Sequence, residues 1–462
     1  MNENLTQKIT AKLADHKRLF YVCRDIERAE GLLDSSHFAP YYFILTNKTP
    51  YSCQLQKKYG DKIILINNKK QLDTWEILTQ IQTSKIITPS DYIVVFKNTK
   101  QIEKIVAENN WKLLNPSAST ASASEEKISQ IDWLGKIKKY LPGYDVEEIK
   151  NIKFVGQEFI IQFNYSHTGS GTILITSQKQ LDELKKNFPN RLARIAKYIV
   201  GPLLTNNNVV WGNKTLLGNI SYQITGMLPF TDKKFATIGN DWSLACKILN
   251  EKQITQYKKI VEDVGQNFVK CGWKGLFGID VVLEEKTGKL YLLEINARQP
   301  ASTSCESWLQ MLDSSMPTYP VGKPQDDKNA NVILSKAKNL DPSVPQDDRL
   351  RRDDNKIASC LAMTNNLTTF EAHSLALLEI PYQNEEIIKI NNGAQIIQRV
   401  TEKIKKMPQD KIKKMNKKFR IVKYNNKKDS ADLVRIQSTS GIMQTHENFN
   451  ELGKEIVKII LG

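Results

Sequence analysis

The sequence predicts an α/β protein built from more than one domain. A chain of 462 residues is longer than one hydrophobic core usually supports, so two or three domains are expected. Over residues 19–115, short apolar runs alternate with polar helix-like stretches. A later segment contains two apolar strands joined by a turn with a Thr-Gly pair, which is typical of a β-hairpin.

Four apolar runs within residues 1–115 are expected to be strands. Three of them are too apolar to have one face in water, and helix-like sequence separates them, which is typical of βαβ units and a parallel sheet. The four runs are Leu19–Cys23, Tyr41–Leu45, Ile63–Ile66 and Tyr92–Phe96. The segment 116–126 is small, polar and unpatterned, and is expected to be a linker.

A second α/β region is expected over residues 127–311. Glu158–Asn164 and Ile173–Ile175 read as strands on either side of a glycine-bearing loop. Apolar residues recur at helical spacing over residues 251–270, which predicts an amphipathic helix that packs on a core.

Residues 312–365 differ in composition from the rest of the chain. They are rich in Pro, Asp, Asn and Lys, and they contain the sequence PQDD twice. Such a stretch cannot bury enough apolar surface to offset the ordering of its backbone. It resembles the translated palindromic repeat elements inserted into some bacterial genes, so we expect a flexible, functionally neutral insertion. Residues 366–462 regain globular patterning and are expected to complete the second region.

Composition excludes several classes of protein. No stretch approaches the roughly 18 apolar residues that a membrane helix needs, and the N-terminus lacks the apolar core of a signal peptide. The six cysteines lie far apart without short Cys/His spacing, which argues against a zinc site or a disulfide framework. We therefore expect a cytoplasmic protein without a membrane partner.

More than half of the net charge of +16 lies in residues 402–429, which hold twelve Lys and Arg against three acids. A basic stripe can bind nucleic acid through phosphate contacts. The alternative is a solvated face in a Lys-rich chain, and no RNP-like aromatic motif or zinc-finger spacing accompanies the charge. Nucleic acid is therefore not the expected partner.

One β-hairpin carries the most informative pattern in the chain. Its expected strands are Gly278–Glu284 and Leu290–Asn296. If their facing ends pair, Asp280 lies directly opposite Glu294. Asn296 is two residues beyond Glu294 and therefore falls on the same face.

The two faces of this hairpin are expected to differ. One face is apolar and packs on the core through Ile279, Val281, Leu283, Tyr291, Leu293 and Ile295. The other is flanked by Val282 and Leu292, which argues against a merely solvated face. Two facing acids repel each other unless something positive lies between them, and hard oxygen ligands suit Mg²⁺. Asp280, Glu294 and Asn296 are therefore the expected metal ligands.

The run GLFGIDVVLEEKTGKLYLLEINARQPAST resembles the metal-binding hairpin of the ATP-grasp superfamily, which includes biotin carboxylase, carbamoyl phosphate synthetase and the D-alanine ligases. The resemblance implies an N-terminal parallel-sheet domain followed by an ATP-grasp domain with a mostly antiparallel sheet. It implies that Asp280, Glu294 and Asn296 hold Mg²⁺ (or Mn²⁺) bridging the ATP phosphates. It also implies that Arg298 is the catalytic residue, in contact with the transferred phosphate or the substrate carboxylate.

The resemblance further implies nucleotide-binding positions. The glycine-bearing loop contains Gly169 and Gly171, which can let backbone N–H groups approach a phosphate. Lys197, Tyr198 and Ile199 fit the hinge whose backbone meets adenine.

Some positions depart from the family's pattern. Gln162, also expected to contact ATP, stands where the family has a phosphate-binding lysine, and Ala196 replaces the acid that usually begins the hinge. A second phosphate lysine has only Lys136 and Lys153 as candidates. His167 could touch a phosphate, although a lone loop histidine is more often incidental.

The implied function is an ATP- and Mg²⁺-dependent ligase that activates a carboxylate as an acyl phosphate for attack by an amine or similar nucleophile. The implied partners are small-molecule carboxylates and amines, with substrate identity and oligomeric state left open. Gln162 and Ala196 motivate a second hypothesis, a pseudo-ligase that binds nucleotide without turnover. Nucleic-acid binding through residues 402–429 is the third.

Overall fold

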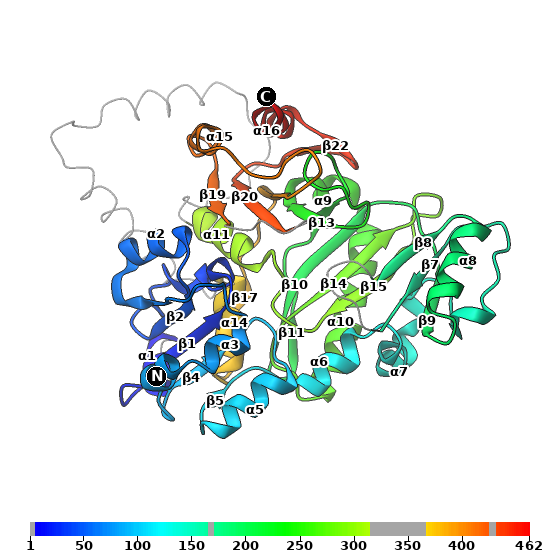
Figure 1. The fold of residues 1–462 in the computed structure, drawn as a ribbon. Helices are drawn as coiled ribbons and strands as arrows, with labels where there is room; N and C mark the ends of the chain where they lie inside the picture. The colour runs from blue at the N-terminus through cyan, green and yellow to red at the C-terminus, as the bar shows by residue number, and fades with distance from the viewer. Residues whose placement is uncertain (1–4, 165–170, 315–365, 425–430) are drawn as a thin grey trace, which may run out of the picture.

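Three main sheets organise the protein, in a computed structural model that describes residues 5–164, 171–314, 366–424 and 431–462. Figure 1 shows a five-stranded sheet at the N-terminal side, a nine-stranded sheet in the centre and a four-stranded sheet at the opposite end. Two further pairs of very short strands lie outside these sheets.

The N-terminal sheet is entirely parallel, as the apolar runs predict. Its strand order is β3-β2-β1-β4-β5. All five side chains of β1 are buried, because helices and loops cover both faces of the sheet. The strands are β1 (Leu19–Cys23), β2 (Tyr42–Asn47), β3 (Ile63–Ile66), β4 (Tyr92–Val94) and β5 (Lys112–Leu113). The helices of this region are α1 (Leu5–Lys12), α2 (Pro50–Tyr59), α3 (Thr74–Leu78), α4 (Ile81–Ile86) and α5 (Lys100–Glu108).

The expected linker 116–126 is not irregular. It contains helix α6 (Ala118–Glu125), which Ser117 caps by accepting a hydrogen bond from Thr120 N. Ala118, Ala121 and Ser124 are buried on one side, so small residues that look unpatterned allow the helix to pack closely. The segment is therefore an ordered helical connection to α7 (Ser129–Leu134).

The central sheet is antiparallel between every pair of neighbours, as expected for the second region. Its strands are β10 (Leu203–Trp211), β11 (Lys214–Leu216), β12 (Ser221–Thr225), β13 (Thr237–Asp241), β14 (Gly275–Leu283), β15 (Leu290–Asn296), β18 (Ala394–Arg399), β19 (Arg420–Lys423) and β20 (Asp432–Ser438). Helix α10 (Glu251–Lys270) matches the predicted amphipathic helix and begins at an Asn250/Gln253 capping box. Its apolar stripe joins the core beneath β14 and β15.

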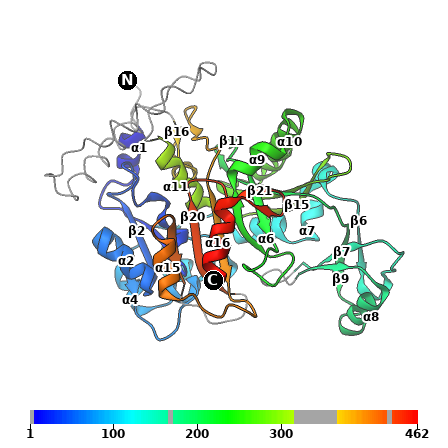
Figure 2. The ribbon, with the colours of Figure 1, turned by 90° about the horizontal axis from the view of Figure 1, so that it is seen from above.

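The four-stranded sheet forms a smaller lobe with its own core. Helix α8 (Gln178–Asn187) packs on this sheet, and Ser177 caps its first turn. The strands, in spatial order, are β6 (Tyr144–Glu148), β9 (Leu192–Lys197), β7 (Phe159–Gln162) and β8 (Thr172–Ile175). Seen from above, this lobe stands out at one end of the molecule (Figure 2).

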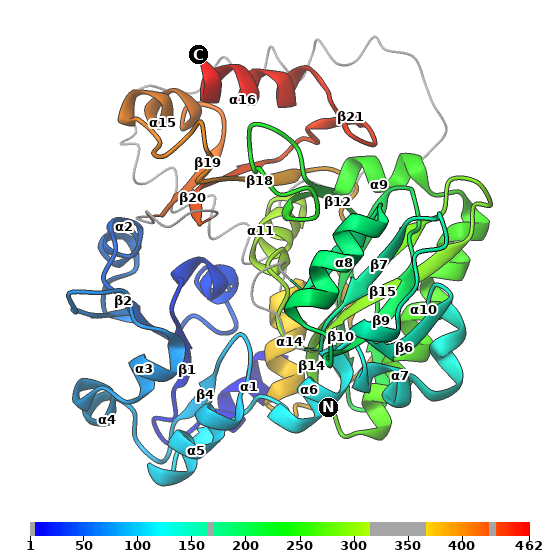
Figure 3. The ribbon, with the colours of Figure 1, turned by 45° about the vertical axis from the view of Figure 1, so that its right-hand side comes forward.

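Residues after the expected insertion complete the central sheet, because β18 pairs with β13. Residues 312–314 end helix α11 (Thr303–Ser314), and residues 315–365 lie outside the described residues. The remaining elements are α9 (Trp242–Ile248), α14 (Thr369–Leu377), α15 (Gln409–Met415), α16 (Glu451–Leu461), β16 (Asn366–Leu367), β17 (Glu386–Ile387), β21 (Met443–Thr445) and β22 (Asn448–Phe449). Figure 3 shows α15 and α16 together beside β18–β20.

The N-terminal region is joined to the rest by buried and partly buried polar contacts. Tyr21 donates to Gln299 Oε1 at 2.5 Å, and Ser35 donates to Glu371 Oε1 at 2.6 Å. Arg420 in β19 forms an ion pair with Glu30. None of the helices in the described ranges is long and apolar enough to cross a membrane.

Candidate active site

Strands β14 and β15 place the three expected ligands on one face of the central sheet. Asp280 pairs with Glu294, and Asn296 pairs with Gly278, as the sequence predicts. Asn296 Nδ2 lies 3.4 Å from Asp280 Oδ2 and donates to it. Thr205 on β10 faces Asp280 from the other side. Two carboxylates and one amide therefore gather where β10, β14 and β15 run side by side.

The predicted register of the hairpin is wrong beyond this point. The pairing shifts between Asp280 and Val281, so that Val281 faces Leu292 and Leu283 faces Leu290. One additional residue in β15, a β-bulge at Leu293, places the side chains that precede it in β15 on the face opposite to the predicted one.

The bulge exchanges the roles of two neighbouring leucines. Leu292, expected beside the acids, is fully buried in the core, together with Leu290. Leu293, expected in the core, instead lines a cavity. Tyr291, also expected in the core, is only partly buried.

Electrostatic interactions distinguish the two carboxylates. Burial, together with the negative charge of Glu294, raises the pKa of Asp280 to about 6. Burial also pushes the pKa of Glu294 upward, but the positive charges of Lys127 and Arg298 outweigh it and hold this pKa below its usual range. The pair thus has the repulsion that a divalent cation would relieve.

Lys127 is one candidate site residue that the sequence did not reveal. Its Nζ lies 3.3 Å from Glu294 Oε1, and its side chain is 12% exposed. Lys136 and Lys153, the two candidates for a second phosphate lysine, are both exposed. Lys127 precedes α7 without a local motif, so only the packing of that segment against β15 could identify it.

Arg298 lies near the carboxylates but already has a partner. Its Nη1 is 2.5 Å from Glu125 Oε1 in α6, and Lys97 approaches the other oxygen of Glu125 at 2.5 Å. Arg298 lowers the pKa of Glu294 without a direct contact. Contact between Arg298 and a substrate therefore requires its guanidinium to share or leave Glu125.

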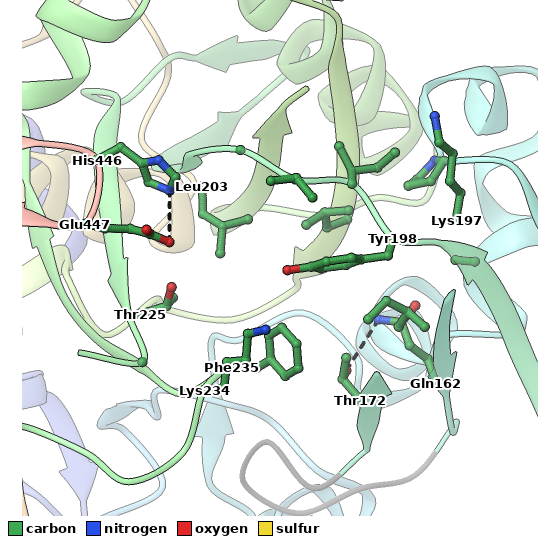
Figure 4. Close-up of a pocket in the computed structure, with 18 of the residues that line it drawn as sticks. Gln162, Thr172, Lys197, Tyr198, Leu203, Thr225, Lys234, Phe235, His446 and Glu447 are labelled. Atoms are coloured by element: carbon green, nitrogen blue, oxygen red, sulfur yellow. Dashed lines mark hydrogen bonds and ion pairs between the residues drawn. The ribbon is translucent and has the colours of Figure 1, made fainter. Parts of the chain in front are cut away.

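A cavity of about 630 Å³ lies between the small lobe and the central sheet; Leu293, the residue next to Glu294, lines it, but none of the three expected ligands does. Figure 4 shows Tyr198 and Phe235 projecting into it, with Gln162 and Thr172 on the lobe side. Much of the wall is apolar, including Ile160, Ala196, Ile199, Leu203, Met227, Leu228 and Leu293. The volume and the mixed lining are typical of a small-molecule site.

The expected hinge residues lie in or beside β9 and line this cavity. The side chain of Lys197, however, is directed elsewhere. Its Nζ forms an ion pair with Glu284 at 2.8 Å and points away from the cavity in Figure 4. Tyr198 and Ile199 remain available to a ligand. The wall opposite includes His446 and Glu447 from the β21–β22 hairpin, which no local pattern could assign to this site.

Gln162 does not present a free amide oxygen to the cavity. Arg194 on β9 pairs with Gln162 in the sheet and donates to its Oε1 from Nε at 3.0 Å and from Nη2 at 2.6 Å. Burial lowers the pKa of Arg194 to about 10, although the negative charge of Glu294 opposes the shift. Sequence reasoning did not identify Arg194, since nothing in the LARIAK strand marks it.

The glycine-bearing loop is described only in part. Gly171 O accepts a hydrogen bond from Phe163 N at 3.0 Å, which closes the ends of the β7–β8 hairpin. Gly169 and His167 lie outside the described residues. In the described parts of the chain, no group of three or more His, Cys, Asp and Glu side chains gathers as a metal centre. The predicted ligand set has two carboxylates and an amide.

The chain resembles known proteins in structure but not in sequence. No family model and no curated protein matches the chain by sequence. By structure it is similar to N5-carboxyaminoimidazole synthetase from Staphylococcus aureus, with a TM-score of 0.58, 11% identity and coverage of 100% of both chains.

Two other solved structures are similar in fold over most of the chain. Biotin carboxylase from Campylobacter jejuni has a TM-score of 0.54 at 12% identity, over 92% of this chain and 87% of that chain. L-amino acid ligase from Bacillus licheniformis has a TM-score of 0.54 at 11% identity, over 96% of each chain. The chain therefore has the α/β fold of these proteins, and the fold class that the resemblance implies is confirmed.

Proposed function

We propose that the protein is an ATP- and Mg²⁺-dependent ligase that converts a carboxylate into an acyl phosphate and then joins it to an amine or similar nucleophile. The proposal rests chiefly on one observation. Asp280, Glu294 and Asn296 share one face of β14 and β15, and Leu293, the residue next to Glu294, lines a cavity between two sheets. The structures similar to this chain include the S. aureus synthetase complexed with ADP and the C. jejuni carboxylase complexed with an ATP analogue.

The residues present fit a divalent cation. Asp280 and Glu294 face each other, and the raised pKa of Asp280 reflects its burial and, after that, the negative charge of Glu294. Asn296 uses its amide nitrogen toward Asp280, which leaves its oxygen for a metal. When bound, Mg²⁺ would neutralise charge on the nucleotide phosphates.

The cavity supports the binding of a planar base. Its apolar wall suits adenine, and the backbone after β9, where Tyr198 and Ile199 line the cavity, is proposed to meet the polar edge of the base. Lys127 then lies at the carboxylate end of the site, where the triphosphate would extend. Lys127 is our candidate for the second phosphate lysine.

The chemistry requires positioning more than a side-chain nucleophile. A carboxylate oxygen of the substrate attacks the γ-phosphorus, the bond to the β-phosphate oxygen breaks, and ADP leaves. The amine then attacks the acyl carbon and inorganic phosphate leaves, while the amine loses a proton. Arg298 is proposed to orient the acceptor carboxylate, exchanging its contact with Glu125 for the substrate. The reaction needs a supply of ATP and small-molecule substrates, which is consistent with the proposed cytoplasmic location and small-molecule partners.

The test is ADP and phosphate release by the purified protein with Mg²⁺, ATP and a panel of carboxylates, each with and without a panel of amines. Release that depends on both substrates and is lost in Glu294→Ala supports the ligase. Nucleotide binding without turnover for any pair favours the pseudo-ligase instead, which the uncharged Gln162 and Ala196 at the cavity wall would suit. Absence of nucleotide binding would refute both.

Nucleic-acid binding through residues 402–429 receives less support. Several of its basic side chains are engaged within the protein: Lys411 donates to Ile460 O, Lys418 pairs with Glu455, and Arg420 pairs with Glu30. Binding that weakens steeply with salt would be the evidence for it.

A further inference from the structure

Arg194 is a buried cation at the wall of the cavity. Its residue is only 3% exposed, yet it is among the residues that line the cavity. Its neighbours in space are Gln162 on β7 and Leu293, the residue just before Glu294. Arg194 therefore lies on the part of the cavity wall near Glu294.

Every hydrogen bond from this guanidinium goes to a neutral acceptor. Nε and Nη2 donate to Gln162 Oε1, Nη1 donates to Gln130 Oε1 at 3.2 Å, and Nη2 donates to Leu293 O at 3.3 Å. These contacts use four of the five guanidinium hydrogens. Among the described residues, no carboxylate forms an ion pair with Arg194.

This arrangement is costly without an anion. Burial of a charge is strongly unfavourable unless the charge is paired. Even the less buried guanidiniums of Arg298 and Arg420, whose side chains are 30% and 28% exposed, have such partners in Glu125 and Glu30. Arg194 has only the more distant field of Glu294, so a ligand phosphate in the cavity would supply the missing negative charge.

We propose that Arg194 binds the phosphate chain of the nucleotide and that Gln162 is a positioning residue that holds its guanidinium at the cavity wall. The inference rests on the proposed function, since it names a residue that grips the nucleotide. The uncharged residue at 162 then does not weaken the site. The positive charge comes from the neighbouring strand, β9, as a planar fork that can contact two phosphate oxygens.

The first experiment measures dissociation constants by calorimetry for Mg-ATP, ADP and adenosine. In Arg194→Met, Mg-ATP is expected to bind about 10- to 100-fold more weakly, since a charge-assisted hydrogen bond is lost. Adenosine is expected to bind as in the unaltered protein. Lys186→Met, the same change of charge at an exposed position of the same lobe, is expected to leave all three constants unchanged.

Two further variants separate phosphate binding from a structural role. Gln162→Glu would pair the guanidinium with a carboxylate, so Mg-ATP should bind as weakly as in Arg194→Met while adenosine binding persists. The exchange Gln162→Lys with Arg194→Gln moves the cation to the facing position of the same strand pair. It should recover Mg-ATP binding to within a few-fold of the unaltered protein.

Distinct results overturn distinct claims. If the unaltered protein binds no nucleotide, the proposed function fails and this inference fails with it. If the unaltered protein binds Mg-ATP and Arg194→Met binds it equally well, only the inference about Arg194 is wrong. Equal losses for Mg-ATP and adenosine would show that Arg194 supports the cavity wall and does not grip phosphate. Failure of the exchange variant, with adenosine binding intact, would equally contradict the assignment.

Discussion

Single side chains set the charge balance of the site. The ammonium of Lys127 lies 3.3 Å from Glu294, and with Arg298 it outweighs the effect of burial on the pKa of that carboxyl. Asp280 faces Glu294 across the strands and has a raised pKa. Lys127 thus neutralises the charge of Glu294, one of the two carboxylates that repel each other. Once a cation occupies the space between the carboxylates, the ammonium of Lys127 can turn toward a phosphate.

Lys127→Met is therefore expected to weaken Mg-ATP binding by about tenfold or more, since a contact between an ammonium and a phosphate is charge-assisted. Calorimetric titration with Mg-ATP measures the change. Lys136→Met is the matched control, because this substitution removes the same charge from an exposed position. Equal dissociation constants for the two variants would show that Lys127 only neutralises Glu294.

At the scale of single elements, the bulge in β15 decides which leucine belongs to the core. Leu292 is fully buried, whereas Leu293 lines the cavity. Leu292→Ala is expected to lower the free energy of unfolding by about 2–5 kcal/mol, as for other core leucines. Leu293→Ala should cost less than about 1.5 kcal/mol, because less apolar surface leaves a packed environment. Urea denaturation of both variants measures the two losses. A larger loss for Leu293→Ala than for Leu292→Ala would support the register without a bulge.

Helix α14 is fastened to the start of β14 by one histidine. His373 Nδ1 accepts a hydrogen bond from Leu276 N at 3.0 Å, and burial lowers the pKa of His373 to about 3. Gly275, at a φ of +85°, makes room for the ring, since a Cβ there would lie 2.5 Å from His373 Nδ1. The neutral imidazole is therefore part of the packing between α14 and β14.

This histidine predicts a pH dependence of stability. Its folded pKa lies below the ordinary value of 6.5, so below pH 6.5 the unfolded chain binds a proton that the folded protein does not. The contribution of His373 to the free energy of unfolding is full above pH 6.5. It falls by about 1.4 kcal/mol per pH unit as the pH drops toward 3. Urea denaturation at pH 7, 6 and 5 should show this slope, and His373→Gln should remove that part of it. An unchanged slope in the variant would contradict the assignment.

At the scale of the whole molecule, residues on both sides of segment 315–365 belong to one packed unit. Gln310 of α11 exchanges hydrogen bonds with Thr369 of α14, from Nε2 at 3.0 Å and to Oε1 at 2.8 Å. Phe370 N also donates to Ser307 at 3.1 Å. These direct contacts hold α11 against α14.

Replacing residues 320–360 with a short Gly-Ser linker is therefore expected to change the free energy of unfolding by less than about 1 kcal/mol, because closure entropy varies slowly with loop length. Nucleotide affinity should also stay the same, consistent with the proposal that this segment is functionally neutral. Urea denaturation and calorimetry measure the two quantities. A loss of several kcal/mol would assign the segment a structural role.

Local patterns were sufficient for most of the fold. The parallel strands, α10 and the pairing of Asp280 with Glu294 all follow from apolar periodicity and strand geometry. The bulge in β15 escaped prediction because one extra residue leaves no mark on composition. Helix α6 escaped it because Ala and Ser carry no strong hydrophobic signal, although Ala121 packs closely.

The parts of the site that come from distant segments were not accessible to the same reasoning. Lys127, Arg194 and Glu447 reach the site from three different elements, and only tertiary packing brings them together. Arg298 was located near the carboxylates by its place after Asn296, but its ion pair with Glu125 could not be foreseen. Strand pairing within one hairpin depends on residues close together in the sequence, whereas the lining of the cavity depends on segments that only the whole fold brings together.

The most direct measurement is the Mg²⁺ dependence of ATP affinity in the unaltered protein and in Glu294→Gln. If Asp280, Glu294 and Asn296 hold the cation together with the nucleotide, Mg²⁺ should tighten ATP binding about tenfold or more over an EDTA-treated sample. The effect should be largely lost in Glu294→Gln and retained in Glu262→Gln, whose carboxylate is exposed on α10. The same Mg²⁺ dependence in all three proteins, or none in the unaltered protein, would contradict the account.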